Sequence, residues 1–156
     1  MTEKLTLEEQ ATNYETMKHI HQVGKNIHIL VSKLLKRADN HDASKLESPE
    51  VEFFTQKTHL LSGLTYGSEE YNQCLKELAP ALEHHYANNR HHAAHYDNGI
   101  NDMNIVDFIE MFCDWAASCK RHNDGNLNKS IEINAKRFDM PEMMVNVLKN
   151  SVEMFE

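Results

Sequence analysis

The sequence predicts an all-α protein, folded as one compact domain over residues 1–156 with about six or seven helices. Three observations support this fold class. Apolar residues recur at intervals of three and four along most of the chain, and strand-like alternation is almost absent. No internal repeat or low-complexity linker divides the 156 residues, a length that suits one domain with a substantial core.

The first expected helix covers residues 16–37, and a polar segment, residues 38–47, follows it. The apolar stripe of this helix is expected to contain Ile20, Val23, Ile27, Leu30, Val31, Leu34 and Leu35. Ser48, Pro49 and Glu50 are typical of an N-cap, a first-turn proline and a favourable acidic residue. They predict that a second helix begins here.

The remaining helices are delimited by turn-forming residues. Ser68 is the last residue of the loop-like segment SGLTYGS and is expected to cap a third helix, which Pro80 should break or kink. A histidine-rich helix is then expected to continue to Asn98-Gly99, where a glycine favours a stop. Further amphipathic helices are expected over residues 103–121, 127–138 and 141–154.

Charge and composition exclude several classes of function. A net charge of −8 repels phosphate backbones, and no cluster of basic residues is interleaved with aromatics, so binding to a nucleic acid polymer is not expected. No apolar run approaches the roughly 20 residues that a membrane span needs. The polar, acidic start MTEKLTLEEQ does not resemble a signal peptide, so the cytoplasm is the expected location.

The cysteines do not suggest a thiolate site. Cys74, Cys113 and Cys119 are odd in number and form no CxxC pair, which argues against a disulfide framework or a zinc knuckle. Cys113 precedes Asp114 inside a predicted helix, where a packed thiol is more plausible than a nucleophile.

The segment LEHHYANNRHHAAHYDNG, residues 82–99, holds five histidines. If its helix is continuous, helical spacing sorts them into two stripes. The inward stripe would contain Leu78, Leu82, His85, Asn89, His92 and Tyr96. The neighbouring, solvated stripe would contain His84, His91 and His95. His85 and His92 are therefore the two imidazoles expected to face the interior.

Other potential metal ligands lie elsewhere in the chain. His19 shares a helix face with apolar residues and is expected to point inward, and His41-Asp42 lies in a segment that joins two helices. One row of acids, which is most often a solvated surface, consists of Asp107, Glu110 and Asp114. Together these groups offer the nitrogen and oxygen donors typical of zinc, manganese, iron or nickel sites.

At these positions the sequence resembles the His-Asp (HD) superfamily of metal-dependent phosphohydrolases, all-helical enzymes with an ordered H…HD…D signature. The resemblance implies an HD-domain-like fold and the ligands His19, His41, Asp42 and Asp114. Members with two metals add two histidines in the interval that His85 and His92 occupy. It implies one or two divalent transition metal ions, among Mn, Fe, Co, Ni and Zn.

Longer segments resemble a family of small proteins of unknown function from bacteriophages and bacteria. The matching segments are KHIHQV, LLKRADNHDASKLESPE, HHYANNRHHAAHY, DFIEMFCDWAASCKRHNDG and SIEINAKRF. They extend over nearly the whole chain and contain all the ligand positions named above. If the protein is encoded by a phage, its expected location is the host cytoplasm.

The HD resemblance implies hydrolysis of a nucleotide or related small phosphoester by a metal-activated water. In some HD nucleotidases a glutamate three residues after the HD aspartate helps to activate water, but Lys45 stands there in this sequence. Glu47 and Glu50 are nearby substitutes, and Lys45 can instead hold a phosphate. We therefore expect catalytic roles for Lys45 and Glu50.

Four polar residues are expected to bind the substrate. Arg37 and Lys45 each lie four residues from His41, and Arg121 lies two helical turns beyond the last aspartate of the signature. Asn89, on the inward stripe, can orient a ligand. The arginines also suit helix C-termini, where cations are favoured. The expected partner is a small phosphorylated compound, by analogy a nucleotide, and no glycine-rich loop indicates ATP-driven transfer.

Two alternative functions remain open. A non-catalytic, metal-stabilised helical protein that binds a nucleotide or a host protein would use the same ligands in a closed coordination sphere. A metal-free interaction protein would place its histidines on the surface and keep its stability when a chelator is added. An apolar last helix, rich in methionine, also leaves room for a homo-oligomer contact.

Overall fold

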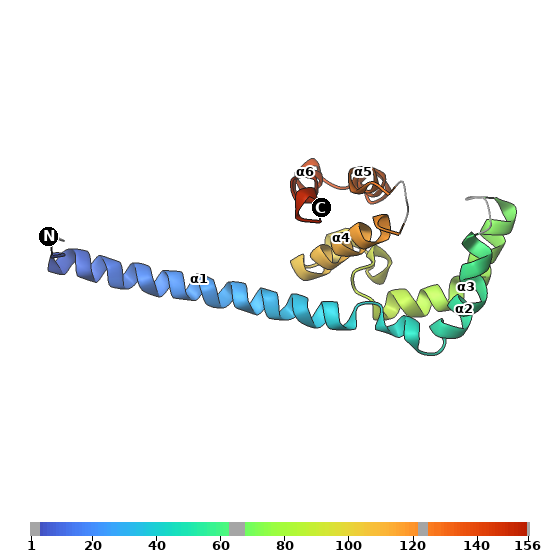
Figure 1. Ribbon diagram of the computed structural model, residues 1–156, viewed down its shortest axis with the longest axis horizontal. Coiled ribbons are helices and arrows are strands. Elements are labelled where there is room, and N and C mark those ends of the chain that lie inside the picture. Colours follow the sequence, from blue (N-terminus) through green and yellow to red (C-terminus); the bar gives the residue numbers. More distant parts are fainter. Residues whose placement is uncertain (1–3, 63–67, 122–124, 156) are drawn as a thin grey trace. The chain divides into compact units, whose positions relative to one another are not determined.

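The computed structural model describes residues 4–62, 68–121 and 125–155, and within these ranges it contains helices and no strand (Figure 1). The α-helices are α1 (Leu7–Asn40), α2 (Glu50–Ser62), α3 (Glu69–Asn88), α4 (Ile105–Cys119), α5 (Leu127–Arg137) and α6 (Glu142–Asn150). Shorter 3₁₀ helices are η1 (Ala43–Leu46), η2 (Ala93–His95), η3 (Gly99–Asp102) and η4 (Val152–Phe155). The predicted all-α class is confirmed. Among the described residues, no helix is long and apolar enough to cross a membrane.

The chain divides into two compact units, residues 1–39 and residues 40–156, and each is described by itself. The assignment of one domain to residues 1–156 therefore stays a prediction. The first unit consists of α1, which contains no buried residue and begins earlier than the expected start at residue 16. A capping box explains the early start, because Thr6 Oγ1 accepts from the Glu9 backbone N–H at 3.2 Å while Glu9 Oε2 accepts from the Thr6 N–H at 2.7 Å.

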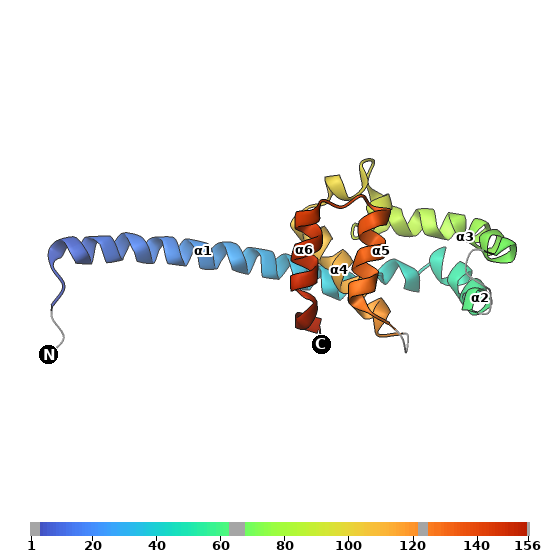
Figure 2. The same ribbon diagram turned by 90° about the horizontal axis from the view of Figure 1, so that it is seen from above.

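In the second unit, α2 and α3 pack against each other (Figure 2). The loop predicted between them falls mostly on residues 63–67, which lie outside the described residues. Pro80 lies inside α3 and does not end it. Its neighbours Leu78 and Ala81 are fully packed, with exposed fractions of 2% and 0%, and this burial offsets the hydrogen bond that the proline removes.

The histidine-rich helix ends at Asn88, so the expected continuation to Asn98-Gly99 is wrong. Two consecutive asparagines end this helix, because their side-chain amides donate hydrogen bonds to carbonyls of the last turn. Asn88 Nδ2 donates to the His84 carbonyl at 2.8 Å, and Asn89 Nδ2 donates to the His85 carbonyl at 2.9 Å. The chain then turns through η2 and η3, so helical phase no longer determines which side chains face inward.

An apolar core lies where α4 packs on α5 and α5 packs on α6. Its buried members are Ile100, Phe108, Met111, Phe112, Ile131, Met140, Leu148 and Val152. The acidic row on α4 is not the solvated surface that was expected, because Asp107 is 0% and Glu110 8% exposed. Asp107 also closes a capping box with Asn104 at the start of α4. Buried carboxylates need partners, and those of Glu110 are His41 and His91.

Candidate metal centre

His41 and Asp42 are positioned by a sharp change of backbone direction after Asn40. Asp42 adopts a left-handed conformation with φ 55° and ψ 17°, which an aspartate tolerates better than most residues. The Lys45 N–H then donates to the Asp42 carbonyl at 2.9 Å and starts η1. This turn brings His41 Nε2 within 3.7 Å of Asp42 Oδ2, so both side chains face one place, as predicted for an irregular segment.

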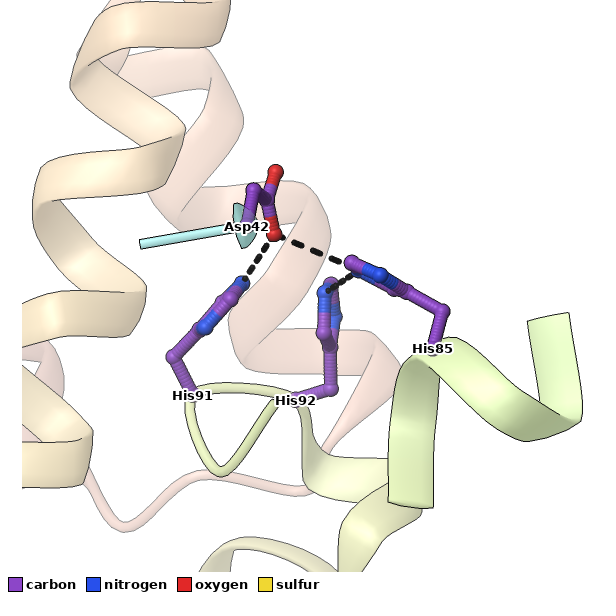
Figure 3. Close-up of side chains that lie close together, drawn as sticks. All are labelled: Asp42, His85, His91 and His92. Atoms are coloured by element: carbon purple, nitrogen blue, oxygen red, sulfur yellow. Dashed lines mark hydrogen bonds and ion pairs between the residues drawn. The ribbon is translucent and has the colours of Figure 1, made fainter. Parts of the chain in front are cut away.

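The first group of potential ligands consists of Asp42, His85, His91 and His92, each offering one donor atom within 4.8 Å of the others (Figure 3). Asp42 Oδ1 lies 3.3 Å from His85 Nε2 and 3.5 Å from His91 Nε2. The Nε2 atoms of His85 and His92 are 2.8 Å apart. Donors around a tetrahedral ion with bonds of about 2.1 Å are separated by roughly 3.4 Å, so this group needs little adjustment to hold one.

Buried donor atoms without hydrogen-bond partners show that the group fits a cation. Among the described residues, neither Asp42 Oδ1 nor either ring nitrogen of His91 has such a partner, although His91 is only 1% exposed. The carboxylates near His91 approach to 3.2 Å and 3.5 Å without the geometry of a hydrogen bond. An unsatisfied buried polar group costs about 1–3 kcal/mol, and a bound ion would remove this cost for Asp42 Oδ1 and one His91 nitrogen.

A second group adjoins the first and shares His91 with it. His41, His91 and Glu110 form this group, with Glu110 Oε1 lying 3.0 Å from His41 Nδ1 and 3.2 Å from His91 Nδ1. Asp114 Oδ1 is 3.8 Å from His41 Nε2, on the same side of α4 as Glu110. Two histidines and a carboxylate can also hold a transition metal, so the cluster offers donors for one ion or two.

Glu50 contacts His85, a member of the first group, at the ring nitrogen that does not face Asp42. Its carboxylate is 0% exposed, with Oε2 at 2.8 Å from His85 Nδ1 and Oε1 at 2.7 Å from His84 Nδ1. When His85 donates its Nδ1–H to Glu50, the Nε2 lone pair points towards Asp42 and is free to bind a metal. Asn89 Nδ2 also donates to Ser44 Oγ at 2.7 Å, which ties η1 to the end of α3.

The electrostatics favour metal binding at the first group. Burial, with the charge of Lys45, lowers the pKa of His85, and burial together with His91 and His85 lowers the pKa of His92 to about 3. Both imidazoles are therefore neutral at neutral pH, the form that donates a lone pair. His41 differs, because the neighbouring carboxylates of Asp114 and Glu110 raise its pKa to about 10. His41 must lose a proton before it can bind a metal.

Several predicted site residues come together in the second unit: His41, Asp42, His85, His92 and Asp114. Lys45 donates to Asp42 Oδ2 at 2.6 Å. Its expected catalytic and substrate-binding roles stay predictions, and so does the expected substrate-binding role of Asn89. His19 and Arg37 lie on α1 in the first unit, and their roles also stay predictions.

Two members of the cluster were missed. His91 was assigned to the solvated stripe but is buried, because α3 ends before it and the turn redirects its side chain. The consecutive Asn88 and Asn89 are the signal that would have indicated this end. Glu110 was missed because the sequence does not show which residues of the acidic row are buried.

The other two histidines expected to be solvated are only half exposed. His84 contacts Glu50, and His95 donates from Nδ1 to the Tyr86 carbonyl at 2.7 Å. They are therefore more exposed than His85 and His91, but each also contacts the protein.

A cavity of about 420 Å³ adjoins the cluster. Its lining comes from α3, the turn after it, η2, α4, α5 and the residue that follows α5, and includes His91, His92 and Asp114. Arg137 also lines this cavity. Arg121, which was predicted to bind substrate, follows the C-cap of α4 and does not line it.

Comparison with known proteins gives a family but no activity. The model of a family described as a family of unknown function (DUF5662) matches residues 8–154, which is nearly the whole chain. Neither the curated proteins nor the solved structures gave a match.

Proposed function

We propose that this chain, which belongs to the family of unknown function DUF5662, is an HD-type metal-dependent phosphohydrolase that acts on a nucleotide or related small phosphoester. One observation carries the proposal. Buried imidazole and carboxylate donors converge at Asp42, His85, His91 and His92, and two of these histidines also line a cavity large enough for a small ligand.

The donor set restricts the metal. Three imidazoles and one carboxylate favour a transition ion such as Zn, Mn, Fe, Co or Ni. Magnesium and calcium prefer sites made only of oxygen donors and are poor matches for the first group. The second group, with two imidazoles and Glu110, has the same preference.

A divalent ion held by Asp42, His85, His91 and His92 would supply Lewis acidity, which would lower the pKa of water towards ~7 and neutralise charge on a phosphoryl group. Asp114 lies where a proton can be exchanged with a ligand, since it lines the cavity and its Oδ1 is 3.8 Å from His41 Nε2. In this proposal Glu50 orients His85, because its carboxylate is fully buried against two histidines. Lys45 balances the charge of Asp42.

One specific observation favours the alternative function. In that alternative the protein is non-catalytic, is stabilised by its metal and binds a nucleotide or a host protein. The first group provides four protein donors, the number that closes a structural zinc site. The two functions therefore differ in whether a coordination position stays open to the cavity.

Metal analysis and a phosphatase screen test the proposal. Protein purified without a histidine tag is assayed for bound metal, loaded in turn with Mn, Co, Ni, Zn and Mg, and screened for phosphate release from nucleotides. We expect a transition metal to support turnover, and Asp42→Ala and His41→Ala to abolish it, with metal binding lost in Asp42→Ala. The matched control is His28→Ala, an exposed histidine on α1. Turnover that survives in Asp42→Ala would contradict the proposal.

The cobalt form separates the two functions. Tetrahedral Co²⁺ bound by four protein donors would keep its visible spectrum when inorganic phosphate is added, whereas an open site would change its spectrum. A constant spectrum, together with no turnover by any metal form, would favour the structural alternative.

A further inference from the structure

Resting on the proposed function, we infer that the cavity between α4 and α5 is a binding site for a nucleoside monophosphate, with Arg137 and the Trp115–Phe138 pair as its recognition elements. We call it the α4–α5 cavity. Its lining includes His91, His92, Asp114, Trp115, Arg137 and Phe138. Its volume of about 420 Å³ falls in the range of small-molecule sites.

The helices α4 and α5 each line the cavity with residues spaced three and four apart. On α4, Met111, Asp114 or Trp115, and Ser118 follow at intervals of three and four, and on α5 the stripe runs from Ser130 to Arg137 through Asn134. Side chains at this spacing share one helix face. Both helices therefore present polar groups to the cavity, with Met111 and Trp115 as the apolar members of the α4 stripe.

Arg137 supplies the positive charge that an anionic ligand requires. The chain has a net charge of −8, so an anion needs a local cation to bind it. Arg137 is exposed in the cavity wall, and no ion pair joins it to a described carboxylate. Its guanidinium lies 5.1 Å from the centre of the Phe138 ring, which holds the cation beside an aromatic surface.

The aromatic residues favour a flat ring in the ligand. Trp115 and Phe138 are half-buried and nearly parallel, with an interplanar angle of 8° and ring centres 6.3 Å apart. Their exposed parts give the cavity an apolar planar wall on which a nucleobase can stack. The amide and hydroxyl groups of Asn134, Ser118 and Ser130 add hydrogen-bonding capacity along the same wall.

The position of the metal cluster orients the ligand. His91, His92 and Asp114 form part of the lining, so a phosphoryl group placed beside them meets the candidate metal centre. The base then extends along the wall formed by Trp115 and Phe138. Neither an inorganic phosphate nor a nucleoside alone would use both features, and a nucleoside monophosphate would use both.

Trp115 makes the test direct, because it is the only tryptophan of the chain and it lines the cavity. Its fluorescence is followed while adenosine, guanosine, cytidine and uridine monophosphates are added to metal-loaded and to chelated protein. Inorganic phosphate and the four unphosphorylated nucleosides serve as comparisons. We expect saturable binding of at least one monophosphate, at least about tenfold tighter than either of its fragments.

The variant Arg137→Gln is expected to weaken this binding about tenfold or more. Lys136→Gln is the matched control, since it removes the same charge from the neighbouring exposed residue, which does not line the cavity. Phe138→Leu, with folding checked by thermal unfolding, is expected to remove the advantage of a monophosphate over inorganic phosphate. The absence of saturable binding by all four monophosphates, or equal effects of the Arg137 and Lys136 variants, would overturn the inference.

The outcomes also separate this inference from the proposed function. Arg137-dependent nucleotide binding without turnover by any metal form would support the site and contradict the hydrolase. Nucleotide turnover that is unchanged in Arg137→Gln would support the hydrolase and overturn the site.

Discussion

His91 is the residue in which the demands of folding and of metal binding conflict most clearly. Its imidazole is 1% exposed, and neither ring nitrogen has a hydrogen-bond partner among the described residues. Folding alone would favour an apolar side chain of similar size at this place, since a buried donor or acceptor without a partner is costly. A metal ion bound by His91 would explain why an imidazole stands there.

The substitution His91→Leu tests this explanation. We expect it to reduce zinc affinity by at least about a hundredfold, because a donor of both groups is lost. Metal-free protein should remain as stable or gain up to about 1–2 kcal/mol, because an unsatisfied buried polar group is removed. Zinc titration calorimetry and urea unfolding in the presence of a chelator measure the two effects. Wild-type zinc affinity in this variant would show that His91 is not a ligand.

In the proposed metal centre Glu50 would contact no metal itself and would act through His85. Glu50→Gln keeps the shape of the side chain but removes the charge that fixes the Nδ1–H tautomer of His85. Loss of such a partner typically lowers metal affinity by about 10–100-fold, and we expect that range here. The control is Glu52→Gln, an exposed carboxylate on the same helix. Equal zinc affinities of the two variants would exclude the positioning role.

At the scale of the elements, the end of α3 decides which histidines meet. His85 could be predicted from helical spacing, because it lies within α3 among the buried Leu78 and Ala81. His91 could not, since the helix stops at Asn88 and the turn after it depends on the contact of Asn89 with Ser44 in η1. Side-chain direction in such a turn is set by tertiary packing and has no period in the sequence.

The acidic row of α4 illustrates the same limit. Its spacing of three and four could be predicted, but not that the packing of α4 would bury Asp107 and Glu110. Burial alone would raise the pKa of Asp107. Hydrogen bonds from Arg90, Tyr96 and the Asn104 N–H outweigh it, so the pKa of this carboxyl lies below its ordinary value.

This shift predicts an acid-dependent loss of stability. A carboxyl whose pKa is lowered by folding stabilises the protein fully above its unfolded pKa of about 3.9, and this contribution is lost as pH falls through the folded value. Asp107→Asn should therefore destabilise chelated protein at about pH 6 and have a smaller effect at about pH 3. Urea unfolding at both pH values measures the difference. An effect of equal size at both would contradict the assignment.

At the scale of the whole molecule, the candidate metal centre links separate segments of the second unit. Its donors come from the turn before η1, from α3, from the turn after it and from α4. An ion bound by these donors stabilises the folded state because the unfolded chain does not hold them together. A bound ion would therefore couple the stability of the fold to the site.

Removal of the metal should lower the melting temperature. With free zinc at about a hundredfold its dissociation constant, binding adds about 2.7 kcal/mol to the free energy of unfolding. Thermal unfolding with zinc and with a chelator measures this difference, and His28→Ala should show the same difference as the wild type. An unchanged melting temperature would favour the metal-free interaction protein.

The all-α class and the pairing of His41 with Asp42 could be predicted, because helical spacing and an irregular connecting segment are local properties. The α4–α5 cavity could not, since it is created where two helices pack, and Arg137 gains its place there only through that packing. For the same reason the sequence predicted a substrate-binding role for Arg121 and none for Arg137.

X-ray absorption of zinc-loaded, tag-free protein tests the central claim most directly, because it reports the atoms bound to the ion. We expect nitrogen and oxygen neighbours at about 2.0–2.2 Å with the outer-shell scattering of several imidazoles. The imidazole contribution should fall in His91→Leu. Sulfur neighbours, or oxygen neighbours without imidazole, would contradict a centre built from Asp42, His85, His91 and His92.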